Sequence, residues 1–232
     1  MLYINSEHPT VQKIARQIKQ AAHDDAEIVA GIFHYVRDDI LFGFHPEVDA
    51  LSASDIIERG SGQCNNKSIV FMALCRALDI PAKLYFSDID RSIHRGFIPE
   101  WAYNIFPKNI SHSWVDVQID GKWHRIDGYI NDISLFLAGR EALIQHGWQT
   151  GFSVSDPTQT SADFSLEQEN YVQMATVTRT HGVYDDPADY FRSSLYQNHP
   201  GGFKQLIAGY IMRQMNHRVE QLRAHYLQAI AI

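Results

Sequence analysis

The stretch from Gly60 to Pro81 reads GSGQCNNKSIVFMALCRALDIP and decides how the rest of the chain is interpreted. A glycine-rich turn runs into Cys64, and the apolar run Ile69 to Cys75 then predicts a buried helix. Because Pro81 disfavours helical geometry in the residue before it, the helix is predicted to end at Asp79. A cysteine in the first turn of a helix lies at the positive end of the helix dipole, which favours the thiolate.

The composition is that of a globular protein with one sizeable core. The 232 residues are 45% hydrophobic and 12% aromatic, and two cysteines do not form a disulfide framework. The net charge of −7, with no dense basic run, argues against nucleic-acid binding. The opening residues lack the apolar core of a signal peptide, and the longest apolar run is too short to span a bilayer. We therefore expect a cytoplasmic protein that does not enter membranes.

The chain before Cys64 is predicted to be helical, because apolar residues recur at helical spacing behind recognisable start signals. Three helices are expected. Their signals are Ser6 as N-cap with Pro9 as first helical residue, a capping box of Asp24 and Glu27, and a second box of Ser52 and Asp55 before a stop at Gly60.

The strongest strand signal is SHSWVDVQIDGKWHRIDGY, from Ser111 to Tyr129. Two alternating runs flank Asp120-Gly121, a dipeptide typical of a type I′ hairpin turn. If Ile119 pairs with Lys122 across this turn, the register of the whole hairpin follows.

In that register Trp114 lies opposite Asp127, and His112 lies opposite Tyr129. His112, Trp114 and Asp127 then share one face, with His112 diagonal to Asp127 at a backbone distance of roughly 7–8 Å. A hydrogen bond between the imidazole and the carboxylate is feasible at that distance. His124 is three residues from Asp127 in the same strand and points to the opposite face.

The remaining chain is predicted in less detail. The expected elements are a strand over Ala82 to Ser87, a long irregular loop over Asp88 to Ile110, a helix over Ile133 to His146, a segment over Leu166 to Arg179 that fits helix or strand, a helix from Asp186-Pro187 to about Tyr196, and a long helix after Gly201-Gly202. The apolar stripe of the last helix fits a core contact or a homo-oligomer contact.

Cys64, His112 and Asp127 together have the residue types of a nucleophilic triad. A histidine activates a thiol, and a carboxylate fixes the orientation of the histidine. Backbone N–H groups at the start of the helix, including that of Cys64, can stabilise an oxyanion. These groups suit acyl transfer through a thioester.

At this point two stretches resemble a known family. GSGQCNNKSIVFMALCRALDIPAK and HSWVDVQIDGKWHRID are similar to the motifs of the transglutaminase-like superfamily, in its small bacterial-type form: a glycine-flanked cysteine opening a helix, a His-x-Trp strand and a strand ending in Asp. The resemblance spans about Ile4 to Tyr129. There are two departures, because Asn65 replaces an aromatic or acidic residue found in many members and Asp79 replaces a frequent Gly.

The resemblance implies a papain-like α+β fold, with the cysteine helix packed on an antiparallel sheet. A single domain is expected, with its core over about 4–130 and a mainly helical C-terminal extension over 131–232. The resemblance also implies that Cys64 is the nucleophile, His112 the general base and acid, and Asp127 the orienting carboxylate. Gln63 and Trp114 are the candidates for contacts to substrate or oxyanion, although Trp114 also fits a packing role. The chemistry needs no metal or cofactor.

The predicted function is acyl transfer from a protein or peptide amide, ending in transamidation, deamidation or hydrolysis according to the acceptor. Two alternatives stay open. An arylamine N-acetyltransferase-like enzyme uses the same residue order with acetyl-CoA, and RGSGQC at Arg59 to Cys64 is similar to a motif of that family. A binding module could keep the fold around an inactive site.

Overall fold

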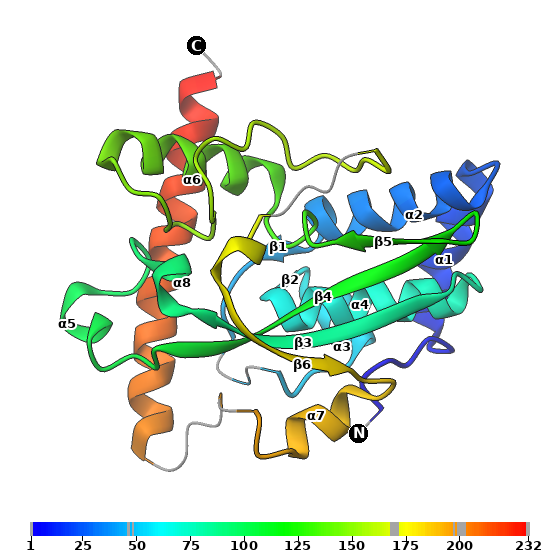
Figure 1. Cartoon of the computed structure of the whole chain (residues 1–232), viewed down its shortest axis with the longest axis horizontal. Coiled ribbons are helices and arrows are strands. Elements are labelled where there is room, and N and C mark those ends of the chain that lie inside the picture. Colours follow the sequence, from blue (N-terminus) through cyan, green and yellow to red (C-terminus); the bar gives the residue numbers. More distant parts are fainter. Residues whose placement is uncertain are drawn as a thin grey trace.

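The computed structural model describes residues 2–45, 47, 49–167, 172–196, 198 and 203–230, without the side chains of 203–206, 229 and 230. It confirms the expected α+β class, because helices pack on an antiparallel sheet (Figure 1). The sheet has the strand order β5-β4-β3-β6, with β3 over Ala82–Asp90, β4 over Asn109–Ile119, β5 over Lys122–Ile126 and β6 over Val177–Val183.

The hairpin register predicted from the turn is confirmed. Ile119 pairs with Lys122 and Val115 with Ile126, while Asp120 and Gly121 have the positive φ values, 51° and 77°, of a type I′ turn. The paired ladder ends at Ile126, so the predicted pairing of His112 with Tyr129 is wrong. A turn closed by the Ile130 N–H on the Asp127 carbonyl takes the chain out of the sheet first.

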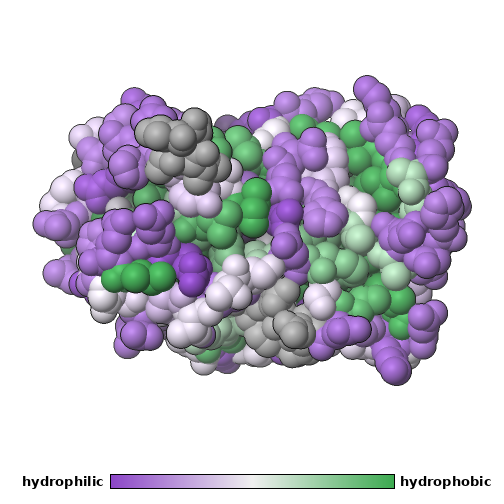
Figure 2. Space-filling model, turned by 90° about the horizontal axis from the view of Figure 1, so that it is seen from above, coloured by the Kyte–Doolittle hydropathy of each residue, from purple (hydrophilic) through white to green (hydrophobic). Residues whose placement is uncertain are grey.

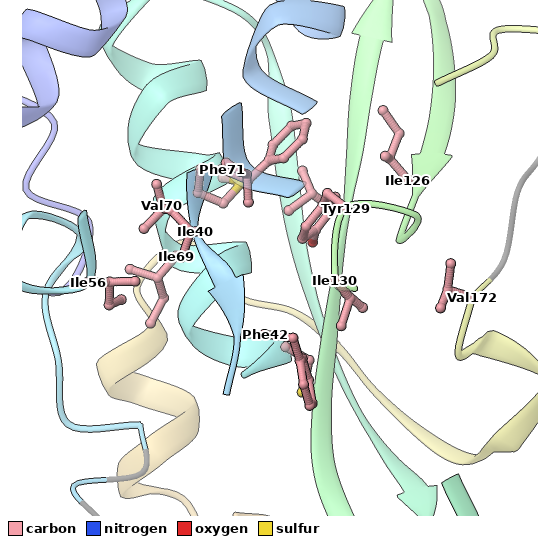
Figure 3. Close-up of a cluster of buried hydrophobic side chains, with 14 of the residues drawn as sticks. Ile40, Phe42, Ile56, Ile69, Val70, Phe71, Ile126, Tyr129, Ile130 and Val172 are labelled. Carbon is pink, nitrogen blue, oxygen red and sulfur yellow. The ribbon is translucent and has the colours of Figure 1, made fainter. Parts of the chain in front are cut away.

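The helix that begins at Cys64, α4 (Cys64–Ala77), is the central element of the fold. Its residues from Cys64 to Cys75 are all buried, polar ones included. Three helices that precede α4 in the chain cover it: α1 (Pro9–Ala21), α2 (Asp25–His34) and α3 (Ala53–Arg59). The strands β3 and β4 also pack on it. Figure 3 shows Phe71 of α4 beside Tyr129, and their ring centroids are 4.7 Å apart.

Most start signals in the sequence are confirmed. The Asp24 side chain caps α2, but the Glu27 carboxylate accepts from the His23 N–H and not from Asp24, so the predicted capping box is only half formed. Ser52 and Asp55 form the capping box of α3, and Gly60 ends α3 at φ +65°. Pro9 is the first residue of α1, but the N-cap is His8 and not Ser6. The helix α4 ends at Ala77, before the predicted Asp79, whose own backbone is left-handed.

The long connection before β4 contains more structure than predicted, namely a 3-10 turn Arg91–His94 and α5 (Glu100–Tyr103).

The other elements not yet named are a π-helical turn Tyr35–Asp39, the two-residue strands β1 (Leu41–Phe42) and β2 (Ser61–Gly62), α6 (Ile133–His146), a 3-10 turn Met174–Thr176, α7 (Pro187–Arg192) and α8 (Phe203–Ile230). The helix after Asp186-Pro187 therefore ends at Arg192, short of the predicted Tyr196. The segment left open between helix and strand leads into β6, which joins the main sheet.

The last helix, α8, packs against α6 at one end of the sheet (Figure 1). Ile211, Met215 and Val219 are buried, so this part of the predicted apolar stripe belongs to the core. Tyr210 stays 52% exposed beside Trp101 of α5. The homo-oligomer contact stays a prediction.

The face of the molecule seen from above is mixed in character (Figure 2). Seen from above, hydrophilic side chains cover much of it, with smaller hydrophobic areas between them (Figure 2). Among the residues that the structure describes, no helix combines the length and apolar character required to cross a membrane.

Asp79 gives a first testable prediction, because its φ of +58° is a conformation that favours glycine. Its side chain is exposed, so we expect Asp79→Gly to raise the free energy of unfolding by about 0.5–1 kcal/mol. Asp79→Ala keeps a Cβ atom and should give no gain. Urea unfolding of the three proteins measures this, and equal stabilities of the Gly and Ala variants would contradict it.

Candidate active site

The thiol of Cys64 lies against the edge of strand β4. Its Sγ is 3.8 Å from the carbonyl oxygen of Ser111, and the backbone N–H of Ser113 bonds to the sulfur. The N–H groups of Cys64 and Asn65, at the start of α4, also point at it. The sulfur therefore lies between the two strand residues that flank His112, with one carbonyl oxygen and three backbone N–H groups around it.

The length of β5 explains why this edge is open to a side chain. The N–H and C=O groups of Val115, Val117 and Ile119 face β5, and Ser111 and Ser113 continue the same side of β4. Because the paired part of β5 ends at Ile126, opposite Val115, no β5 residue occupies the edge at 111–113. The first turn of α4 reaches that edge instead.

His112 and Asp127 are both fully buried, but they are not hydrogen-bonded to each other. Both ring nitrogens of His112 are buried and have no hydrogen-bond partner within the described part of the chain. The Asp127 carboxylate accepts from the backbone N–H of Val172 at 2.9 Å and of Gln173 at 3.0 Å. The predicted imidazole–carboxylate bond is thus absent here, and a segment far along the chain binds the carboxylate.

The buried carboxylate of Asp49 holds both neighbours of Cys64. Its Oδ1 accepts from Gln63 Nε2 at 3.0 Å, and its Oδ2 accepts from Asn65 Nδ2 at 3.0 Å. Asn65 also donates to Ser111 Oγ at 3.0 Å. No motif in the sequence points to Asp49. Asn65, which departs from the family pattern, supplies the side-chain amide that donates to Asp49.

The chain after β6 returns to the same place. Tyr190 donates to Ser111 Oγ at 3.1 Å, Tyr196 donates to Asp49 Oδ2 at 2.7 Å, and the Ser111 N–H donates to Asn198 Oδ1 at 3.2 Å. These C-terminal residues were also missed, since nothing in their local sequence points to Cys64. They bind Ser111 and Asp49, which surround the start of α4, and Cys64 is only 7% exposed.

Burial dominates the electrostatics of the thiol. It raises the pKa of Cys64 to about 12, and the negative charge of Asp49 adds to the effect. The backbone N–H groups of Asn65, Ser113 and Cys64 act in the opposite direction but are outweighed. The helix start therefore favours the thiolate as expected, but in this covered arrangement the desolvation of the charged form exceeds that effect.

The histidine and the aspartate are governed by burial as well. Burial lowers the pKa of His112 to about 3, and the neighbouring His94 contributes in the same direction. His94 is itself buried against Phe42 and Phe44, which lowers its pKa to about 3. Burial raises the pKa of Asp127 to about 6, against the effect of its backbone donors. Uncharged forms of Cys64 and His112 are thus favoured at neutral pH.

The two other candidate residues of the sequence are buried around the site. Gln63 is the N-cap of α4 and bonds Asp49 through its side chain. Trp114 stacks on Tyr85, with centroids 5.1 Å apart, and donates Nε1–H to Asp116. A role of either residue toward substrate or oxyanion stays a prediction.

A buried lysine, Lys67, lies one turn after Cys64 on α4. Its Nζ donates to the Arg37 carbonyl at 3.1 Å, and burial lowers its pKa to about 7. Asp132, which is paired with Arg223 of α8 at 2.6 Å, acts against that shift. In the described residues, no group of three or more His, Cys, Asp or Glu side chains is placed to hold a metal ion.

The burial of His94 and His112 leads to a prediction of how stability depends on pH. Both histidines have folded-state pKa values of about 3. Below pH ~6.5 the unfolded chain therefore binds protons that the folded chain does not, and the free energy of unfolding decreases as the pH falls toward 3. Replacing one of them by Gln should reduce this fall by about 1.4 kcal/mol per pH unit. Chemical unfolding of His112→Gln and His94→Gln between pH 4 and 6 measures it. Slopes equal to that of the wild type would contradict the assignment.

A family model described as the transglutaminase-like superfamily matches residues 12–128, just over half of the chain. The comparison with curated proteins returned no match.

Two solved structures are similar to part of the chain. A protein from Cytophaga hutchinsonii described as a candidate cysteine protease is 23% identical with a TM-score of 0.42, covering 55% of this chain and 38% of its own. A TGase is 15% identical with a TM-score of 0.35, covering 53% of this chain and 32% of its own. This chain therefore spans less than half the length of either. By the family match, which includes Cys64, His112 and Asp127, the chain belongs to the transglutaminase-like superfamily.

Proposed function

We propose that this protein is a cysteine acyl-transfer enzyme that acts on amide bonds of proteins or peptides. Cys64 is the nucleophile, His112 the general base and acid, and Asp127 the group that orients His112. The observation that carries the proposal is the position of the Cys64 sulfur, which contacts the two strand residues on either side of His112. Membership in the transglutaminase-like superfamily supports it.

In the proposed reaction His112 accepts the thiol proton as the Cys64 sulfur forms a bond to the carbonyl carbon. The carbonyl oxygen becomes an oxyanion near the N–H groups of Cys64 and Asn65. His112 then returns the proton to the nitrogen, the C–N bond breaks, and an amine leaves. The product is a thioester on Cys64.

The thioester is resolved by an acceptor that His112 deprotonates. An amine gives a new amide and water gives a carboxylic acid, and in both cases the C–S bond breaks and the thiol regains its proton. Transamidation, deamidation and hydrolysis differ only in the donor and the acceptor. The substrate must also displace or pass what covers Cys64, because the thiol is buried.

Acylation of Cys64 is the first test of this function. With p-nitrophenyl acetate as acyl donor we expect a burst of p-nitrophenolate and an acetyl adduct on Cys64, seen by peptide mass spectrometry. Cys64→Ala should abolish both signals. Cys75→Ala is the matched control, since Cys75 is a free, fully buried thiol on the same helix. A burst that survives in Cys64→Ala would refute the assignment of the nucleophile.

The role of His112 is tested by its removal. His112→Ala should slow acylation about 10²- to 10⁴-fold, the usual contribution of a general base. His124→Ala is the control, because His124 pairs with Val117 and lies on the other face of the hairpin. Stopped-flow rates compare the two, and equal rates would remove His112 from the mechanism.

A further inference from the structure

The C-terminal residues that bind Ser111 and Asp49 beside Cys64 begin in α7, where one residue, here called the root of the segment, packs in the core. The root is Tyr190, which is fully buried and stacks on Phe86 of β3 with centroids 4.0 Å apart. Phe191 next to it also packs on Phe86. These aromatic contacts belong to the core, so the root stays in place whenever the protein is folded.

The tip of the segment, Tyr196 and Asn198, is held by polar contacts and, at Tyr196, also by aromatic contacts with Tyr190 and Phe191. Tyr196 donates its hydroxyl to Asp49. The Asn198 carboxamide is bound at both ends, because its oxygen accepts from the Ser111 N–H at 3.2 Å and its side chain hydrogen-bonds to Asp49. Asn198 itself is only half-buried.

This arrangement has the donors and acceptors that recognise a carboxamide. A backbone N–H faces the amide oxygen, and a carboxylate, which only accepts, faces the amide nitrogen. A carboxylate ligand would be repelled by Asp49, and an ammonium group has no acceptor for the Ser111 N–H. Asp49 is buried, so water does not screen this preference.

The carboxamide position and the thiol share neighbouring residues. The Ser111 carbonyl contacts the Cys64 sulfur at 3.8 Å, and Asp49 binds the side chains of Gln63 and Asn65. A group bound there is therefore held by residues that also contact Cys64 or its two sequence neighbours.

We propose that Asp49 and the Ser111 N–H form a binding site for a carboxamide group, and that Asn198 of the same chain fills it and keeps Cys64 covered. Release of the tip would empty the site and open the approach to the thiol, while the root at Tyr190 holds the segment nearby. The inference rests on the proposed function, since a carboxamide site beside Cys64 matters for catalysis only if Cys64 is the nucleophile.

Accessibility of Cys64 tests the covering role. Methyl methanethiosulfonate contains no carboxamide and transfers a methylthio group to a thiol, with methanesulfinate as leaving group. We expect Asn198→Ala and Tyr196→Phe each to raise its rate at Cys64 about tenfold, because each removes hydrogen bonds that hold the tip. Asn198→Asp should act at least as strongly, since it places a second carboxylate against Asp49. Ser194→Ala, an exposed position of the same segment, should react like the wild type.

Cys75 serves as an internal reference in the same digest, because it is fully buried on the far part of α4. It should stay unmodified in every variant. Parallel modification of Cys75 would mean that general unfolding exposes Cys64, and would overturn the proposal. Unchanged Cys64 rates in all three tip variants would overturn it as well.

Ligand chemistry tests the carboxamide site. In Asn198→Ala, propionamide should slow modification of Cys64, and propionate, which matches it in shape, should not. Equal protection by both, or by neither, would contradict a site made by Asp49 and the Ser111 N–H.

These readouts are separate from catalysis. If the tip variants expose Cys64 but no acetyl adduct forms with p-nitrophenyl acetate, the proposed function fails and the carboxamide site stands. If the wild type acylates as fast as the tip variants do, the acyl-transfer function stands and the covering role of Asn198 fails.

Discussion

The complete burial of the first turn of α4 is the constraint on which the rest of the structure depends. Polar groups removed from water must find partners inside the protein, and this turn carries several in succession. The partners come from distant parts of the chain. Asp49 binds Gln63 and Asn65, and the edge of β4 receives the Cys64 sulfur. The site is thus assembled by the same contacts that satisfy a buried helix end.

Two opposed effects act on the pKa of the Cys64 thiol, and their relative sizes decide whether it is protonated. The helix start and the backbone donors favour the thiolate, while burial and the charge of Asp49 favour the thiol. Burial prevails here, as expected when a charged form loses its hydration. Under the proposed function, displacement of what covers Cys64 would expose the sulfur and also restore hydration to its thiolate form. Access to Cys64 and activation of Cys64 would then be linked, because the same displacement changes both.

Local signals predicted the fold well where periodicity and turn chemistry agreed. Asp120-Gly121 set the register of the hairpin, and Gly60 and Ser52 bounded α3, because these effects involve only near neighbours. Asp49 and Asn198 were beyond prediction, since no local pattern in the sequence links either residue to Gln63, Asn65 or Ser111. The absence of a hydrogen bond between His112 and Asp127 could not be predicted either. The Val172 and Gln173 N–H groups bind the Asp127 carboxylate, and they belong to a segment whose path the sequence leaves open.

The early end of β5 has a consequence for how the chain tolerates insertions and deletions. Residues added at the tip of the hairpin, beyond the Ile119–Lys122 pair, would leave the ladder unchanged. One residue added between Lys122 and Asp127 would turn the carboxylate to the opposite face, since side chains alternate along a strand. Two residues would restore the face but extend β5 toward Ser113, where its backbone would compete with the Cys64 sulfur for the same edge. The number of residues in β5 is therefore constrained, because a longer strand would occupy the edge of β4 that the Cys64 sulfur contacts.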